Sequence, residues 1–279
     1  MLHQVPFRRI AVAIAFSPRR EAVLFEAAHL RELYDAELIL IHIGEKQENK
    51  LVQLDALIDD YKIPHDKVHI CWGKGLPAQK IVEICRHEQV DLLVAGALRK
   101  ENLLNFYLGS VARYITMHAP CSVLIFTEPS RKVRRFQQII VSARPEPVRP
   151  LTLYHAARLA RKEKAQQLQI IREVEPLWSF SSVPAPPSER TVVAETEAIE
   201  EIFSGIKTKK LNLNISITSA REGHALKYIA QKQQADLLVL SAPQTHWPLV
   251  DRWIHRELHY LLSDLPTNLL LIKENKHVH

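Results

Sequence analysis

The sequence predicts two α/β domains in tandem, each built on a doubly wound, mainly parallel sheet. Three observations predict this: a length of 279 residues, an internal repeat, and short apolar runs that alternate with helix-period segments. A chain of this length can bury two hydrophobic cores of ordinary size. We place the first domain at residues 1–130 and the second at residues 131–279, with the junction near residues 129–135.

An internal repeat organises the chain, because three segments of the first half match three of the second in the same order. The early match is offset by 129 residues and a later one by 145, so the second half carries 16 additional residues. Proline and serine are frequent in residues 175–190, which predicts that the insertion is a loop there. The matched pairs are 25–43 with 154–173, 81–97 with 226–242, and 117–126 with 263–273.

Continuous apolar runs predict the strands of the first half. Strands that are apolar throughout are buried on both faces, which is typical of parallel sheets covered by helices. Right-handed crossovers then give a flavodoxin-like or Rossmann-like sandwich, whose ligands bind beyond the carboxyl ends of the strands. An amphipathic segment at residues 20–34 predicts the first helix. The predicted strands are 10–16, 38–43, 68–72, 91–96 and 122–126.

The segment VAGALRKENLLNFYLGSVARYITMHAPCSVLIF, residues 94–126, resembles the end of a universal stress protein domain. Nucleotide-binding members of that family carry Gly-x2-Gly-x9-Gly-Ser/Thr after the fourth strand. Gly96 matches the first glycine, and Gly109 and Ser110 match the final pair, whereas Arg99 replaces the second glycine. The resemblance implies the universal stress protein fold and a small-molecule ligand, with ATP or another adenine nucleotide as the first candidate.

The Gly109–Ser110 pair has two readings from its chemistry alone. A helix that begins there presents unpaired backbone N–H groups and a positive dipole end to an anion, and Ser110 adds a hydroxyl donor. Alternatively, the pair simply caps the helix that runs through Val111, since serine is a favoured N-cap residue. The remaining candidate ligand-binding residues lie at the predicted strand ends: Ala15, Phe16, Ser17 and Ile41.

Several positions depart from the family pattern. Nucleotide-binding members carry an aspartate at the end of the first strand, where this chain has Ala15. In the second half, Ser241 replaces the first glycine, and His255 and Arg256 fall opposite Gly109 and Ser110. We therefore expect a partial nucleotide motif in the first domain and a degenerate one in the second.

Composition limits the other functional classes. The apolar runs are too short to cross a bilayer, and three unpaired cysteines suit the reducing cytoplasm. A net charge of +6 favours binding to polyanions such as nucleic acids. The basic residues, however, gather in two connectors, so we expect no nucleic-acid partner. The resemblance implies dimers that pair through the final strand, so we expect an internal pseudo-dimer through the last apolar run of each half, with a homodimer as a further association.

No catalytic or metal motif is evident. His255 and His259 have metal-binding spacing but lack a third ligand, so we expect no metal site, and we assign the repeated Asp91 and Asp236 to helix termination. Three functions stay open: a ligand-binding stress protein without rapid turnover, a scaffold with both pockets degenerate, and a weak adenine-nucleotide hydrolase. We favour a non-enzyme.

Overall fold

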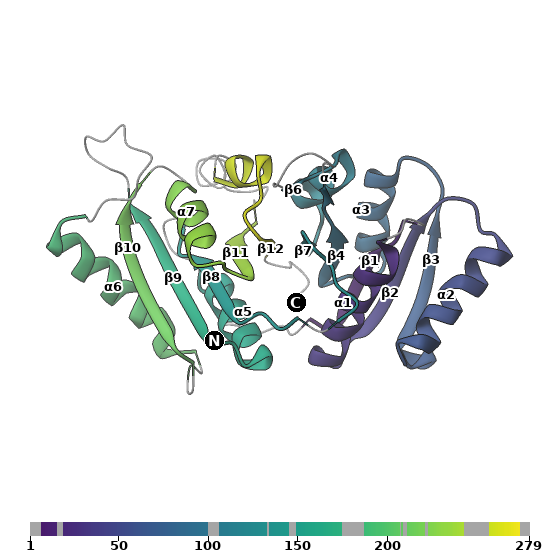
Figure 1. The fold of residues 1–279 in the computed structure, drawn as a ribbon, viewed down its shortest axis with the longest axis horizontal. Helices are drawn as coiled ribbons and strands as arrows, with labels where there is room; N and C mark the ends of the chain where they lie inside the picture. Colours follow the sequence, from purple (N-terminus) through teal and green to yellow (C-terminus); the bar gives the residue numbers. More distant parts are fainter. Residues whose placement is uncertain are drawn as a thin grey trace. The chain divides into compact units, whose positions relative to one another are not determined.

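The computed structural model describes residues 7–15, 19–99, 106–132, 134–144, 149–174, 187–206, 208, 211–220, 223–242 and 257–273. Contacts divide the chain into two compact units. The first holds Met1–Leu98, Leu108–Arg134 and Asn275–His279, and the second holds Arg99–Tyr107 and Arg135–Glu274. Each unit has its own layer of strands flanked by helices (Figure 1).

The first unit contains parallel strands in the order β3-β2-β1-β4-β7. Strands β2 and β3 lie on one side of β1, and β4 and β7 lie on the other. With right-handed connections, the helices then cover both faces of the sheet. Strands β5 (Leu98–Arg99) and β6 (Phe106–Tyr107) pair with each other outside this sheet, and β6 is grouped with the second unit. The other elements are β1 (Arg9–Ala13), α1 (Arg20–Tyr34), β2 (Glu37–Ile43), α2 (Glu48–Asp60), η1 (His65–Lys67), β3 (Val68–Gly73), α3 (Pro77–His87), β4 (Leu92–Gly96), α4 (Ser110–His118) and β7 (Ser122–Phe126).

The second unit repeats this arrangement, with parallel strands in the order β10-β9-β8-β11-β12. Residues 257–263 are also helical. The α/β class and the parallel sheets predicted from the sequence are confirmed. The elements are β8 (Gln138–Ser142), α5 (Pro150–Glu163), β9 (Gln167–Val174), α6 (Glu189–Ser204), β10 (Leu213–Ser219), α7 (His224–Lys232), β11 (Leu237–Ser241) and β12 (Asn268–Ile272).

The central strands are buried on both faces, as their continuous apolar runs predict. Leu92, Leu93 and Val94 of β4 are each at most 1% exposed, and β11 is buried along its whole length. The predicted helix at 20–34 coincides with α1. Burial of apolar surface at about 25 cal/mol per Å² is the main stabilising contribution to such cores.

The prediction of a loop at residues 175–190 is wrong at the C-terminal end of that range. Helix α6 begins at Glu189, and the Ser188 hydroxyl accepts the backbone N–H of Thr191 at 3.2 Å as its N-cap. Capping by a serine side chain is worth about 1 kcal/mol and fixes the start of the helix there. Residues 175–186 lie outside the described part of the chain.

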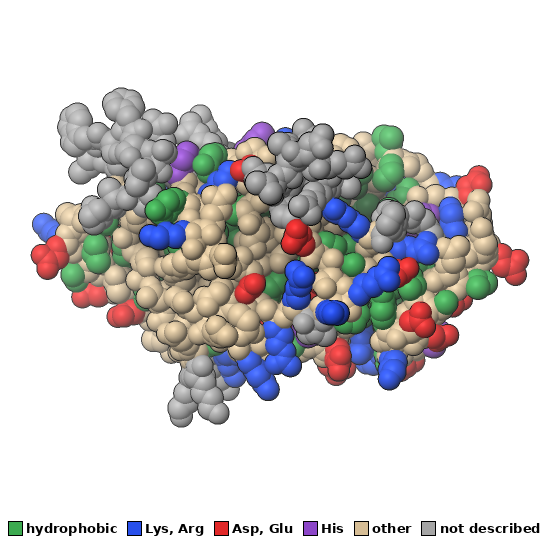
Figure 2. All heavy atoms as spheres, viewed as in Figure 1, with side chains coloured by type: hydrophobic (Ala, Val, Ile, Leu, Met, Phe, Trp, Pro, Cys, Tyr) green, Lys and Arg blue, Asp and Glu red, His purple; other side chains and the backbone are tan. Residues whose placement is uncertain are grey.

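Charged side chains of both signs are interspersed over the described part of the face in Figure 2. Among the described ion pairs, Arg131 Nη2 lies 2.6 Å from Glu21 Oε2. No helix within the described residues is both long enough and apolar enough to span a membrane.

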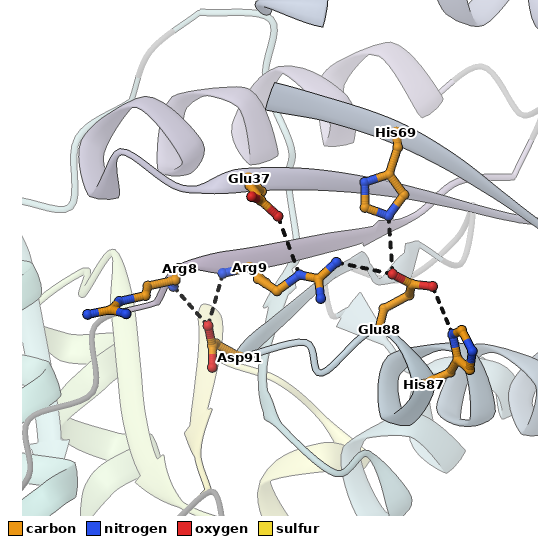
Figure 3. A network of polar contacts seen from close by, with 7 residues as sticks. All are labelled: Arg8, Arg9, Glu37, His69, His87, Glu88 and Asp91. Atoms are coloured by element: carbon orange, nitrogen blue, oxygen red, sulfur yellow. Dashed lines mark hydrogen bonds and ion pairs between the residues drawn. The ribbon is translucent and has the colours of Figure 1, made fainter. Parts of the chain in front are cut away.

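The repeated aspartates do not terminate helices, which corrects the assignment made from the sequence. Helix α3 ends instead at His87, and Gln89 adopts a left-handed conformation with φ 50°, as Gln234 does after α7 with φ 51°. Asp91 Oδ2 accepts the backbone N–H groups of Arg8 and Arg9, both at 2.9 Å, and so joins the start of β4 to the start of β1 (Figure 3).

The second unit repeats this contact with the same geometry. Asp236 Oδ2 accepts the N–H groups of Gln137 and Gln138, both at 2.8 Å, at the start of β8. One carboxylate oxygen therefore holds two adjacent amides at the same edge of each sheet, and the repeated aspartate is explained by strand alignment.

Asp91→Ala is expected to lower the free energy of unfolding by about 2 kcal/mol, because two backbone donors lose their acceptor. Asp91→Asn is the matched control, since its single amide oxygen can still accept both N–H groups. Urea unfolding followed by circular dichroism measures both variants. Equal losses in the two variants would contradict this role for the carboxylate oxygen.

Candidate functional site

The carboxyl ends of β1 and β2 carry a contact that is repeated in both units. In the first unit, His42 Nδ1 lies 3.0 Å from the carbonyl oxygen of Ile14. In the second, Arg172 Nη1 donates to the carbonyl oxygen of Ala143 at 3.0 Å. Position 42 therefore corresponds to 172 and position 14 to 143, which also pairs Ala15 with Arg144.

An arginine at the start of the first helix of each unit reaches the end of the fourth strand. Arg19 Nη1 donates to the carbonyl oxygen of Ala97 at 2.9 Å, and Arg149 Nη1 donates to that of Ala242 at 2.9 Å. Arg19 is the N-cap residue of α1 and is half-buried. It places a fixed positive charge beside the segment that leaves β4, which favours an anionic ligand at this edge.

Helix α4 begins at the predicted Gly109–Ser110 pair. Gly109 is its N-cap residue with φ −60° and ψ 165°, and no side chain caps the helix within the described residues. Ser110 is exposed and Val111 is half-buried. The first-turn N–H groups and the Ser110 hydroxyl thus form a donor set that an anion can bind.

The other predicted site residues have different surroundings. Ala15 is exposed beyond the end of β1, whereas Ile41 is 1% exposed and its carbonyl accepts the N–H of Ile14 at 2.8 Å. A Cβ at Gly96 would lie 3.1 Å from Val23 Cγ2, so this glycine permits close packing of α1 on β4. Arg99 lies in β5, and its side chain is outside the described part of the structure. Phe16 and Ser17 lie outside it entirely.

The same edge of the second unit is filled by a buried carboxylate. Glu173 lies near the end of β9, and its side chain has no solvent exposure. Its Oε2 accepts the N–H of Gly223 at 2.7 Å, and its Oε1 accepts that of Leu226 at 3.1 Å. These amides form the N-terminus of α7, so Glu173 occupies a helix end where an external anion would otherwise bind.

Charged neighbours complete this internal network. Arg144 Nη1 lies 3.9 Å from Glu173 Oε2, and Arg172 Nε lies 2.9 Å from Glu195 Oε2. Glu257, 5% exposed, accepts the Ser142 hydroxyl at 3.0 Å through Oε1. At the positions equivalent to Arg144 and Glu173, the first unit has Ala15 and Ile43, neither of which carries charge.

Burial, followed by the charge of Glu257, raises the pKa of Glu173 to about 8, although the two amide hydrogen bonds and Arg144 oppose this shift. Because the two carboxyl groups are close, the Glu173–Glu257 pair retains one proton at neutral pH. The network is therefore nearly neutral in sum, which is compatible with its burial.

This raised pKa predicts a pH dependence of stability. The folded state holds a proton that the unfolded chain releases above its ordinary pKa of 4.5, so the free energy of unfolding falls as pH rises towards 8, by up to about 1.4 kcal/mol per pH unit. Urea midpoints measured from pH 5 to 9 should decline more steeply in the wild type than in Glu173→Gln, which cannot ionise. Parallel curves would mean that Glu173 is ionised throughout.

Sequence reasoning missed Arg19, Arg144 and Glu173. The repeat could have indicated Arg19, because both halves carry arginine just before the first helix, although the offset there is 130 rather than 129. Glu173 is 29 residues from Arg144 and 84 from Glu257, and no short motif links them. His259 is exposed, and its predicted partner His255 lies outside the described residues.

Comparison with known sequences identifies part of the first unit. Residues 44–127 match the family model described as the universal stress protein family. A universal stress protein of Methanocaldococcus jannaschii is 30% identical over 96 residues, which cover 34% of this chain and 55% of that protein. One from Synechocystis sp. is 29% identical over 92 residues, covering 32% and 58%. The chain therefore spans a little over half the length of these curated relatives.

Comparison with solved structures extends the fold to nearly the whole chain. A universal stress protein from Archaeoglobus fulgidus superposes with a TM-score of 0.70 at 14% identity and covers 95% of this chain and 98% of its own. A functionally unknown protein from Pseudomonas aeruginosa PAO1 gives a TM-score of 0.68 at 18% identity, covering 96% and 93%. At these identities the similarity is one of fold.

Proposed function

Since residues 44–127 match the family model of universal stress proteins, we propose that this chain is a ligand-binding signalling protein of that family. Its first unit binds an adenine nucleotide, with ATP as the first candidate, or a related small anion, and turns it over slowly if at all. The second unit binds none at the equivalent edge. A cytoplasmic location is part of this proposal.

The observation that carries the proposal is the contrast between the two equivalent sheet edges. In the first unit, α4 begins at Gly109 without a side-chain cap, and Arg19 lies at the end of β4. In the second unit, Glu173 takes the amides of α7, the counterpart of α3, and Arg144 stands where the first unit has Ala15. The second unit therefore satisfies donors at this edge with its own carboxyl group, whereas the first unit has no charged side chain at either equivalent position.

The phosphate groups of the ligand interact with the first turn of α4. Backbone N–H groups and the helix dipole stabilise negative charge there, and the Ser110 hydroxyl can donate a further bond. Arg19 contributes positive charge at the end of β4. Ala15 lacks the carboxylate that the family pattern places at the end of the first strand, so recognition of the nucleoside depends on other contacts.

A scaffold without nucleotide affinity is the second candidate, and the Glu173 network favours it for the second unit. A scaffold would bind its partner proteins through its surface and not through a ligand pocket. The predicted pairing of the two halves through their last strands belongs to either function, and chemical cross-linking with light scattering tests it.

Native mass spectrometry followed by calorimetric titration with ATP tests the proposal. A copurified nucleotide, or a dissociation constant in the micromolar range with one site per chain, supports it. Two equivalent sites, or no binding at millimolar ATP, would overturn it, and the second result would favour the scaffold.

A further inference from the structure

The outer strand β3 carries two potential metal ligands on one face. His69 and Cys71 are two residues apart on this strand, so their side chains point to the same side of the sheet. Glu88 follows directly after α3 and faces them. The His69 imidazole, the Cys71 thiol and the Glu88 carboxylate each offer an atom within 4.8 Å of the other two.

The spacing of the His69 imidazole and the Glu88 carboxylate is that of two ligands in a tetrahedral zinc site. His69 Nε2 and Glu88 Oε2 are 3.3 Å apart, and Figure 3 shows these side chains pointing toward one another. Zinc–ligand bonds of about 2.0–2.3 Å place neighbouring tetrahedral ligands roughly 3.3–3.8 Å apart. The His–Glu pair already has this spacing, and the Cys71 sulfur lies within 4.8 Å of both ligand atoms.

The chemistry of the three groups selects the ion. Thiolate, imidazole and carboxylate together match zinc, whereas magnesium and calcium prefer oxygen ligands alone. Three protein ligands leave one position for water or for a small ligand. A cavity of about 500 Å³ lies beside two of the three ligands and is lined in part by Cys71, Trp72, Ile84 and Glu88.

Glu88 is held by further contacts that orient it. His87 Nδ1 lies 2.9 Å from Oε1, and Arg9 Nη2 donates to Oε2 at 3.1 Å (Figure 3). The hydrogen bonds with His87 and His69, together with the charge of Arg9, lower the pKa of Glu88 despite its partial burial, so the carboxylate is ionised. Arg9 also lies 3.5 Å from Glu37 Oε2, and that carboxylate can retain the guanidinium when a cation binds.

We propose that His69, Cys71 and Glu88 form a binding site for zinc or a similar borderline-soft divalent ion. The site lies at the outer strand of the first unit, toward the amino ends of the strands, and so is separate from the nucleotide site proposed at their carboxyl ends. His87 positions Glu88 and does not itself coordinate the ion.

Metal binding at this site releases a proton from the thiol. Burial and the charge of Glu88 raise the pKa of Cys71 to about 11, so the thiol is protonated at neutral pH in the absence of metal. The affinity for zinc should therefore increase with pH.

Cobalt substitution and zinc competition with a chromophoric chelator test this site on the full-length chain. One cobalt ion per chain should give tetrahedral visible bands and a thiolate-to-cobalt charge-transfer band. Cys71→Ser should abolish the charge-transfer band. Cys71→Ser, His69→Ala and Glu88→Gln should each weaken zinc binding by about 100-fold, and His87→Ala by about tenfold.

Cys121→Ser is the matched thiol control, because Cys121 is buried and absent from the cluster, and it should keep both the band and the affinity. Circular dichroism verifies that each variant is folded. The proposal is overturned by unchanged zinc affinity in Cys71→Ser, by a cobalt spectrum without thiolate character, or by loss of binding only when His277 and His279 are replaced.

Discussion

Gly109→Asp is expected to weaken ATP binding to the first unit by at least about 100-fold, which corresponds to about 2.7 kcal/mol. The new carboxylate would accept the first-turn N–H groups of α4 and repel the phosphates from the same position. The backbone at Gly109, with φ −60° and ψ 165°, is allowed for any residue, so the fold should tolerate the change. Isothermal titration calorimetry with ATP gives the affinities.

Gly109→Asn separates charge from capping in this experiment. Asparagine caps a helix about as well as aspartate but carries no charge, so it should weaken binding less. Thermal unfolding should show that the aspartate variant is at least as stable as the wild type. Unchanged ATP affinity in Gly109→Asp would remove α4 from the site.

Glu173→Ala is expected to lower the free energy of unfolding by about 3 kcal/mol. Two amides at the start of α7 lose their acceptor, and Arg144 loses the carboxylate 3.9 Å away. Breaking a buried charged network by removing one member costs about 3–5 kcal/mol. Urea unfolding gives the overall loss, and hydrogen exchange measured by peptide mass spectrometry should show faster exchange around Gly223 and Leu226.

Glu37→Ala is the control for this second prediction. Glu37 is a half-exposed carboxylate whose ion pair with Arg9 spans 3.5 Å, so its removal should change stability by less than about 1 kcal/mol. A loss in Glu173→Ala no larger than this would show that the buried carboxyl group does not stabilise the second unit.

The strands could be predicted because burial on both faces leaves a continuous apolar signal, as in β4 and β11. The ends of the helices were harder to predict. Left-handed Gln89 and Gln234 end their helices without glycine, and the Asp91 and Asp236 that follow gave no sign that they bind backbone amides across the sheet. Such contacts depend on strand order, which local patterns do not encode.

The candidate site was predictable only where a local motif exists. Gly109 and Ser110 fall at the start of α4, as their spacing implies, whereas Ile41 is buried and Gly96 has a packing role. The network around Glu173 joins residues from β9, α7 and the segment after β8. None of these residues belongs to a recognisable sequence motif. Only the three-dimensional repeat, which pairs Ala15 with Arg144, makes the contrast between the units visible.

Photoaffinity labelling with azido-ATP, followed by peptide mapping, tests most directly whether the first unit alone binds nucleotide. The account predicts labelled peptides from the strand ends and α4 of the first unit, with labelling suppressed by excess ATP and lost in Gly109→Asp. Competable labelling confined to peptides around Glu173 and α7 of the second unit would contradict it.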